Sequence, residues 1–382
     1  MKRLLPLALL LTAAAPPASI TPGYAPQDAD ERGLWMQVDE YERQFKTSNF
    51  VMRDPALNDY VRRVFCRTVG DAQCRDVRIY VVRTPYFNAS MAPNGMMQVW
   101  SGLFLRARNE AQLAAVLGHE YTHYANRHTV KQFRDIKNKT NAVAWLSVIP
   151  LGGAIAGGIA LAQLGMIGSV FSNSRDAERE ADAGALPMLV KAGYDPSAAA
   201  RVWGQILAED AATAAERKRR KRREGGMFAT HPTSVERQGE LDRQAKLLAA
   251  SSATALNAAE YRAALAPWWA EFIDDQVKLN DFGATELLLG QLADGNWTGE
   301  LLYARGELYR ARGKPDDFKA ATQFYRDGLA RGAPVEAWRG LGVALLRSGD
   351  TPGGQAALKT YLERKPEAKD KAIMATMAGV TS

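Results

Sequence analysis

Two of the four histidines in the chain frame a glutamate in the sequence His119-Glu120-Tyr121-Thr122-His123. Four residues advance an α-helix by about 400°, so the two imidazoles project from one face, within reach of a single metal ion. Glu120 lies beside them, where a general base is needed. The motif therefore requires a helix and predicts a zinc-hydrolase site, with two metal-free histidines on a polar helix face as the alternative.

Two strands and a turn are expected before the helix that carries this motif. Residues 77–82 alternate and contain β-branched side chains, as a strand requires, and 96–100 form a second strand after the strong turn signal at 93–95. Asn109 is placed to cap the next helix, with Gln112 at its third position. We expect the edge of 96–100 to receive an extended polypeptide as an added strand, with an ordinary core strand as the alternative.

A third protein ligand must lie outside the motif, because catalytic zinc typically takes three and keeps one position open. The segment 174–182 places Glu178 and Asp182 on one helical face. There Glu178 would bind the ion, and Asp182 would hydrogen-bond a ligand histidine. Glu180 points about 200° away from Glu178. The alternative is an acidic helix face that is simply solvated.

Another histidine of the same region, His128, is excluded from the predicted zinc ligands. It follows His119 by nine residues, which is about 900° of rotation, so a straight helix places it on the opposite side. We expect His128 to serve in packing or in a hydrogen bond.

The length of 382 residues exceeds what one average domain uses, so two domains are expected. Residues 1–18 combine Lys2 and Arg3 with an apolar run and small residues, a pattern typical of a secretory signal peptide. Export would permit a disulfide between the only cysteines, Cys66 and Cys74. Two buried free thiols would fit the sequence nearly as well.

Two further segments bear on membrane contact. Residues 142–171 are almost wholly apolar or glycine and long enough to span a bilayer. Their glycines favour a broken helical hairpin, buried or peripheral, over membrane insertion, which stays the alternative. The consecutive basic residues 217–223 account for the net charge of +7 and are interpreted as a solvated loop or as a contact with anionic lipid. Nucleic acid is not expected as a partner, because an exported protein seldom meets it.

The C-terminal third has the character of paired helices with an internal repeat. Five residues recur 36 residues later, namely Leu302, Gly306, Gly313, Ala320 and Tyr325 as Trp338, Gly342, Gly349, Ala356 and Tyr361. The segment 338–342 matches the start of the tetratricopeptide pattern. We therefore expect domains at 28–248 and 252–378, the second a tetratricopeptide-like helical repeat domain, with a generic helical bundle as the alternative.

The order of the motifs resembles that of a known peptidase family. His-Glu-x-x-His is followed by Ser-Arg-x-x-Glu-x-Glu-Ala-Asp at 174–182, then by His231-Pro232 and by Arg237. Further matching pieces lie at 87–89, 93–95 and 101–103. Over roughly 50–240, the chain is similar to the zinc metallopeptidase family that contains the CAAX prenyl proteases and the HtpX-type proteases.

The resemblance implies an α+β fold, mainly α. It implies a gluzincin-like zinc metallopeptidase domain with a small β-sheet, followed by the helical repeats. It also implies one Zn²⁺ per chain, held by His119, His123 and Glu178, with Asp182 in support.

Two roles for His231 follow from the resemblance. It either donates to the developing oxyanion, with Arg237 supporting it, or fills the fourth zinc position and holds the enzyme inactive. Both roles need His231 near the metal, whereas the alternative is the cap of a surface turn.

The combination with a signal peptide and repeats is closest to the periplasmic branch of the family, the beta-barrel assembly-enhancing proteases. We therefore expect an exported zinc metalloendopeptidase of cell-envelope protein quality control, with Glu120 as the general base. Its partners would be protein or peptide substrates, the envelope assembly machinery through the repeats, and the membrane surface through 142–171 and 217–223. The alternative is a chaperone or adaptor that binds clients through the repeats, with a latent peptidase site inhibited by His231.

Overall fold

The chain is described by a computed structural model over residues 20–139, 174–217, 231, 235–249 and 255–380. The predicted signal peptide at 1–18 and the apolar segment 142–171 lie outside these residues, as does the basic run apart from Arg217. Among the helices that the structure describes, none has both the length and the apolar character needed to cross a membrane.

A small sheet is embedded among helices in the first part of the chain. The elements before the apolar segment are α1 (Ala29–Phe45), β1 (Val51–Met52), α2 (Pro55–Val69), α3 (Asp71–Cys74), β2 (Arg78–Val82), β3 (Ala89–Met91), β4 (Met96–Trp100), α4 (Ser101–Arg106), α5 (Glu110–Ala125) and α6 (His128–Lys139). After it come α9 (Arg175–Lys191), α10 (Ser197–Glu216), α12 (Val235–Ala249), α13 (Ala258–Leu265), η1 (Ala266–Trp268), α14 (Trp269–Lys278), α15 (Phe282–Ala293), α16 (Gly299–Arg312), α17 (Pro315–Leu329), α18 (Glu336–Arg347), α19 (Thr351–Arg364) and α20 (Lys371–Met377). The predicted class, α+β and mainly α, is confirmed.

The described strands form one mixed sheet with the order β1-β2-β4-β3. β4 lies inside the sheet, parallel to β2 and antiparallel to β3. The turn between β3 and β4 follows the predicted signal: Gly95 has φ +86°, and its amide donates to the carbonyl of Ala92 at 3.0 Å. Because both edges of β4 are paired, the expectation of an open edge at 96–100 is wrong.

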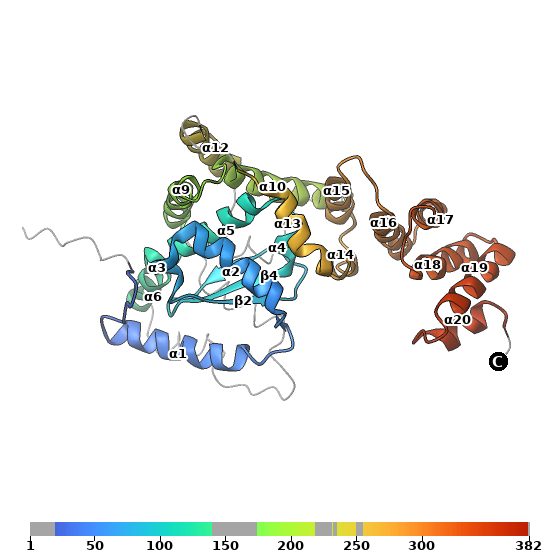
Figure 1. Cartoon of the computed structure of the whole chain (residues 1–382), viewed down its shortest axis with the longest axis horizontal. Helices are drawn as coiled ribbons and strands as arrows, with labels where there is room; N and C mark the ends of the chain where they lie inside the picture. Colours follow the sequence, from blue (N-terminus) through green and yellow to red (C-terminus); the bar gives the residue numbers. More distant parts are fainter. Residues whose placement is uncertain (1–19, 140–173, 218–230, 232–234, 250–254, 381–382) are drawn as a thin grey trace, which may run out of the picture.

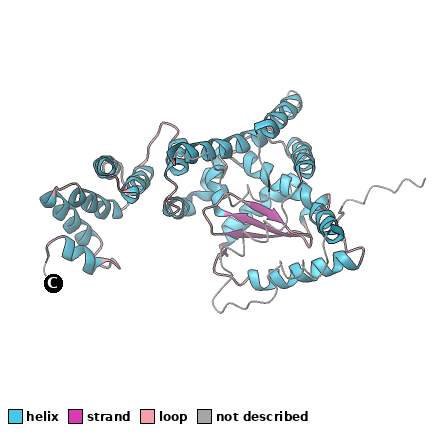
Figure 2. Ribbon diagram, turned by 180° about the vertical axis from the view of Figure 1, so that it is seen from behind, coloured by secondary structure: helices cyan, strands magenta, loops and turns pink. Residues whose placement is uncertain are grey.

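Hydrophobic layers cover the two faces of the sheet. Successive side chains of β4 point to opposite faces, so Met96 and Trp100 pack with Phe45 of α1, while Met97 and Val99 join the main core with α2 and α5. Figure 1 and Figure 2 accordingly show α1 on one side of the sheet and α2, α5 and α10 on the opposite side. The helix that carries the motif is therefore in the covered interior.

Helix α5 carries the predicted motif. Asn109 caps it as predicted, since its side-chain oxygen accepts a hydrogen bond from the amide of Gln112 at 2.9 Å. Every residue from Glu110 to Tyr124 is buried. The helix contacts α2, α9 and α10, so its polar side chains must find partners inside the protein.

Helix α5 ends at Ala125, and the backbone turns left-handed at Arg127, where φ is +56°. The buried guanidinium of Arg127 holds this turn by donating from Nε to Glu31 of α1 at 3.1 Å. Helix α6 then begins at His128. The expectation of a straight helix running through His128 is therefore wrong, and its side chain does not lie on the far side of α5.

Helix α9 packs closely against α5. Ser174 caps α9 by accepting a hydrogen bond from the amide of Ala177 at 3.1 Å. A Cβ at Gly184 would lie 2.5 Å from Cγ2 of Thr122 in α5, so a larger residue would require a shift. This close approach occurs inside the motif itself and fixes the separation of the two helices there.

A disulfide joins the end of α2 to α3. Cys66 and Cys74 are bonded across a Cα–Cα distance of 4.9 Å. Of the two alternatives left open by the sequence, the structure has the disulfide, which closes the short turn at Gly70 between these helices.

Helices α13 to α15 pack on the first part of the chain. Phe272 of α14 stacks on Phe104 of α4, with ring centroids 5.8 Å apart. Arg106 of α4 is 1% exposed and donates to Glu209 of α10 at 2.9 Å and to Gln276 of α14 at 3.0 Å. One hydrophobic core thus extends across the predicted domain boundary, which itself stays a prediction.

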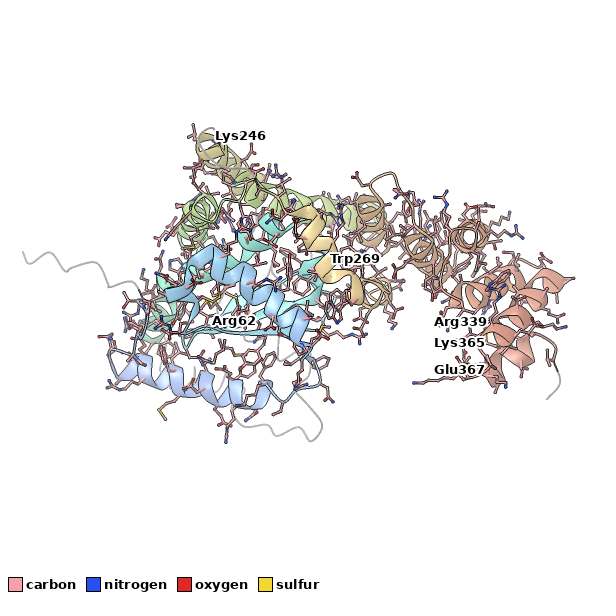
Figure 3. The ribbon with its side chains drawn as sticks, viewed as in Figure 1. Arg62, Lys246, Trp269, Arg339, Lys365 and Glu367 are labelled. Carbon is pink, nitrogen blue, oxygen red and sulfur yellow. A yellow bond between two sulfur atoms is a disulfide. The ribbon has the colours of Figure 1, made fainter. Side chains whose placement is uncertain are left out.

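Helices α16 to α19 form two successive pairs, followed by α20 (Figure 1). The repeated glycines mark close contacts within each pair. A Cβ at Gly306 would lie 2.6 Å from the ring of Tyr325, and one at Gly342 would lie 2.6 Å from Leu358. Arg339 of α18, labelled in Figure 3, is ion-paired with Asp370, which directly precedes α20. The paired helices agree with a helical repeat, and its tetratricopeptide class stays a prediction.

Candidate metal centre

Helix α5 brings two imidazoles and a carboxylate to one buried region. The Nε2 atoms of His119 and His123 lie 3.1 Å apart, as the four-residue spacing predicts. Both histidines are buried, and so is Glu120. The motif therefore faces the interior rather than a solvated helix surface.

Helix α9 adds the predicted third donor. Glu178 is fully buried, with Oε1 at 3.4 Å from Nε2 of His123 and Oε2 at 3.6 Å from Nε2 of His119. Glu180 lies on the other side of the helix and is exposed. The face predicted for Glu178 is confirmed, and the alternative of a solvated acidic face is wrong for this residue.

His231 reaches the same point from a distant part of the sequence. Its Nδ1 lies 2.8 Å from Oε1 of Glu178 and 3.3 Å from Nε2 of His119. Its Nε2 lies 3.4 Å from Oε1 of Glu120. A buried ring in these contacts is not the cap of a surface turn, so that alternative is wrong.

The spacing of these donors fits a tetrahedral zinc site. One potential ligand atom from each of His119, His123, Glu178 and His231 lies within 4.8 Å of the others. With zinc–ligand bonds of about 2.0–2.1 Å, neighbouring ligand atoms of a tetrahedron are about 3.3 Å apart. The separations of 3.1, 3.4 and 3.6 Å among the three predicted ligands lie close to that value.

The buried charges also fit a divalent cation. Glu120, Glu178 and Asp182 are carboxylates, and Arg237 is the guanidinium among them; each is at most 9% exposed. With neutral histidines, these groups leave an excess of two negative charges in a region poorly accessible to water. A zinc ion would compensate that excess.

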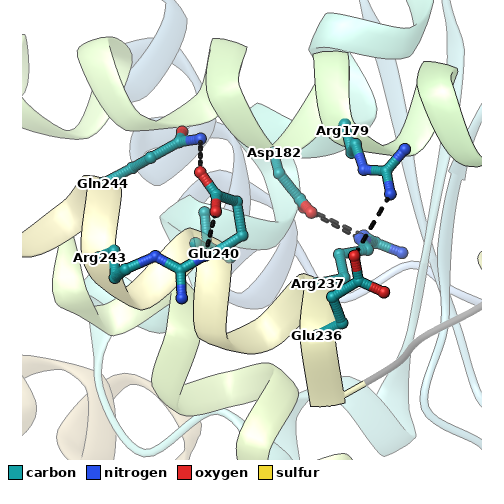
Figure 4. Close-up of a pocket in the computed structure, with 8 residues that line it drawn as sticks. Arg179, Asp182, Glu236, Arg237, Glu240, Arg243 and Gln244 are labelled. Atoms are coloured by element: carbon teal, nitrogen blue, oxygen red, sulfur yellow. Dashed lines mark hydrogen bonds and ion pairs between the residues drawn. The ribbon is translucent and has the colours of Figure 1, made fainter.

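An outer layer supports the donors. Nδ1 of His119 lies 3.0 Å from Oδ1 of Asp182. Arg237 of α12 donates to both oxygens of Asp182, at 2.5 and 3.0 Å, and a third nitrogen lies 2.7 Å from Oε2 of Glu178. Figure 4 shows Arg237 directed at Asp182 beside a pocket between α9 and α12. Asp182 thus lies where the sequence predicted it, against His119, one of the predicted ligands.

The pKa shifts differ between the two histidines of the motif, since burial lowers the pKa of His123 well below its usual value. Burial disfavours the charged form of His119, yet Asp182 and Glu178 raise its pKa to about 9. Burial likewise opposes ionisation of Glu178, but His231 and His119 hold the pKa of its carboxyl well below the usual value. Burial raises the pKa of Glu120, which makes its carboxylate a stronger base than an exposed one.

His128, which the sequence placed away from the site, also contacts it. Its Nδ1 lies 2.8 Å from Nδ1 of His123, and its Nε2 lies 3.0 Å from Oε2 of Glu180. The hydrogen bond expected of His128 is confirmed, and its partner is His123 of the candidate metal centre. The left-handed residue that ends α5 is Arg127, not the glycine or asparagine usual at such positions, so the break has no ordinary signal in the sequence.

The family model described as Peptidase family M48 matches residues 53–245, half of the chain. This chain belongs to peptidase family M48. The M48 match covers α2 to α12 and hence all the donors described above. Membership confirms the expected kind of fold, a zinc metallopeptidase domain with a small sheet.

Individual M48 relatives match the same part of the chain. A Vibrio cholerae protein, named among the beta-barrel assembly-enhancing proteases, is 31% identical over 181 residues, which are 45% of this chain and 37% of that protein. The beta-barrel assembly-enhancing protease of Escherichia coli is 29% identical over 180 residues, 44% of this chain and 36% of its own. The mitochondrial metalloendopeptidase OMA1 of Schizosaccharomyces pombe is 30% identical over 153 residues, which are 40% of this chain and 44% of that protein. The matched region spans little more than a third of the length of the bacterial relatives.

Proposed function

We propose that this chain is an exported zinc-dependent metalloendopeptidase that hydrolyses proteins of the bacterial cell envelope. The observation that carries the proposal is the convergence of His119, His123 and Glu178 on one buried point, with Glu120 beside them. Membership of the M48 family supports the reaction class. Relatives named for beta-barrel assembly and the signal-peptide pattern at 1–18 support a periplasmic location.

Each residue of the centre has a role in this proposal. A zinc ion held by His119, His123 and Glu178 would polarise the scissile carbonyl and make a water molecule more acidic. Glu120 takes the proton of the attacking water and later delivers it to the leaving amine. The carboxylate of Asp182, 3.0 Å from Nδ1 of His119, favours a proton on that nitrogen, so that Nε2 of the ring keeps its lone pair for the ion.

We further infer that His231 occupies the fourth position when the enzyme is at rest. The short separations from Nδ1 of His231 to Glu178 and His119 support this closed arrangement. Hydrolysis then requires the ring to move away from that position. Arg237 holds the neighbouring carboxylate of Glu178, and donation by His231 to the oxyanion is the alternative role of this ring.

The same closed arrangement favours a second candidate function, a chaperone or adaptor with a latent peptidase site. In that case, the helical pairs α16 to α19 bind protein clients or the envelope assembly machinery. Contacts with the membrane surface through 142–171 and 217–223 belong to either candidate.

The variant E120Q separates the two functions. If the chain is a peptidase, E120Q lowers cleavage of an unfolded protein such as casein by about 100-fold or more, while zinc content stays at one ion per chain. D176N is the matched control, because Asp176 is an exposed carboxylate at the start of α9. Equal cleavage by wild type and E120Q, with zinc bound to both, contradicts the peptidase proposal.

The variant H231A separates the two roles of His231. If the ring closes the fourth position, H231A cleaves casein faster than wild type. If the ring acts only on the oxyanion, H231A is slower by about 100-fold. A slower H231A with unchanged zinc affinity would therefore contradict the resting state proposed here.

A further inference from the structure

We propose that His128 is a positioning residue for His123, and that Glu180 orients His128 in turn. The three side chains form one hydrogen-bonded chain, which leads from the exposed face of α9 to the metal centre. The inference rests on the proposed zinc function of His123 and adds residues that neither the motif nor the family match assigns.

The contacts of His128 are compatible with this role. Its Nδ1 lies 2.8 Å from Nδ1 of His123, with the two rings inclined at 75°. Its Nε2 lies 3.0 Å from Oε2 of Glu180. The side chain of His128 is 3% exposed, whereas that of Glu180 is 57% exposed. A buried imidazole thus uses both of its nitrogens, one toward a proposed ligand and one toward a surface carboxylate.

The proton positions in the hydrogen-bonded series His123–His128–Glu180 follow from one requirement. Nε2 of His123 faces the other donors, so it must keep its lone pair for the ion, and the ring proton must be on Nδ1. Two nitrogens 2.8 Å apart cannot both carry a proton between them, so Nδ1 of His128 must accept. The proton of His128 is then on Nε2, where it donates to Glu180.

The backbone break after α5 is what makes this geometry available. The left-handed conformation of Arg127, held by its buried contact with Glu31, ends one helix and starts α6 at His128. A continuous helix would carry His128 to the opposite side of α5. Glu31 of α1 therefore helps to orient the ring of His123. It holds Arg127, and the turn at Arg127 places His128 against His123.

The two histidines of the motif are consequently supported in different ways. His119 contacts the carboxylate of Asp182 directly, at a buried position. His123 reaches its carboxylate, Glu180, through the intervening ring of His128. Partners of this kind fix ring orientation and tautomer, and their loss typically weakens metal binding by about 10–100-fold.

Two substitutions at His128 test the role in the full-length zinc protein. H128L fills similar space but accepts no hydrogen bond, and we expect the zinc dissociation constant to rise about 10–100-fold in chelator competition. In H128N, the amide oxygen can take the place of Nδ1 as the acceptor, so we expect zinc affinity within about 5-fold of wild type. H128L with wild-type zinc affinity, or H128N as weak as H128L, would overturn the proposal.

The tautomer of His128 gives a readout that a purely structural role does not require. The chain has only four histidines, so ¹⁵N-histidine labelling resolves each ring in the zinc-loaded protein. We expect His128 to be neutral with its proton on Nε2, and His123 to carry its proton on Nδ1. A proton on Nδ1 of His128 overturns the inference. Failure of wild type to bind zinc would instead contradict the proposed function, which distinguishes the two.

Discussion

Nδ1 of His119 lies 3.0 Å from a carboxylate oxygen of Asp182, and both side chains are at least nine-tenths buried. The pair places a negative charge directly behind a proposed zinc ligand. Because Arg237 also binds Asp182, the carboxylate is held from two sides and cannot easily rotate away.

The variant D182N is expected to weaken zinc binding by about 10–100-fold, because the amide does not supply the negative charge that orients His119. It also leaves the buried guanidinium of Arg237 without one of its anionic partners, so the free energy of unfolding should fall by about 3 kcal/mol. Chelator competition and urea denaturation measure the two effects. D176N, on the exposed side of α9, should change neither.

The contact between Gly184 and Thr122 predicts a coupled effect of two substitutions. G184A should lower the free energy of unfolding by about 1–3 kcal/mol, because the new Cβ meets Cγ2 of Thr122 at 2.5 Å. T122A removes that methyl group, so the double variant should be more stable than the sum of the single effects. G290A is the control, because its Cβ would meet nothing within 4 Å. Additive effects in the double-mutant cycle would show that the contact is not limiting.

The ion pair of Glu42 with Arg78 predicts a pH-dependent contribution to stability. Burial opposes ionisation of Glu42, but Arg78 and Tyr80 lower the pKa of its carboxyl below the ordinary 4.5. The folded state therefore favours the ionised form. Its stabilisation is present at neutral pH and is lost as pH falls below about 4.5 through the lowered pKa.

The variant E42Q should accordingly be less stable than wild type by about 1–3 kcal/mol at pH 7. The difference should shrink at pH 3, where urea denaturation can be compared for both proteins. E363Q removes a charge from an exposed glutamate and serves as the control. A difference between wild type and E42Q that is independent of pH would exclude the ionised pair as its cause.

Removal of zinc should lower the melting temperature, because an ion bound only by the folded chain stabilises it. At a free zinc concentration of about 1,000 times the dissociation constant, the stabilisation is about 4 kcal/mol. E178Q removes a proposed ligand, and calorimetry with and without chelator should show little difference for it. A chelator effect as large in E178Q as in wild type would argue against Glu178 as a ligand.

Local features of the site could be predicted from the sequence. The cap at Asn109 and the shared face of His119 and His123 depend on residues within one or two helical turns. The helical face made Glu178 a candidate, and the resemblance to the peptidase family favoured it over a solvated acidic face. Such short-range geometry is largely independent of the rest of the fold.

The errors concern contacts between distant residues. The break after α5 depends on Arg127 and its partner Glu31, 96 residues away, so the placement of His128 failed. The edge expected at 96–100 is covered because β3 and β2 pair with both sides of this strand. Strand order and long-range ion pairs are set by the whole fold and leave no local signal.

The burial of Arg106 between Glu209 and Gln276 has a consequence for cooperativity. A chain truncated near residue 250 would lose Gln276 and uncover the ring of Phe104, which stacks on Phe272. Helices α13 to α15 should therefore unfold together with the peptidase domain as one thermodynamic unit. An autonomous catalytic fragment of this chain would need to extend at least through α15.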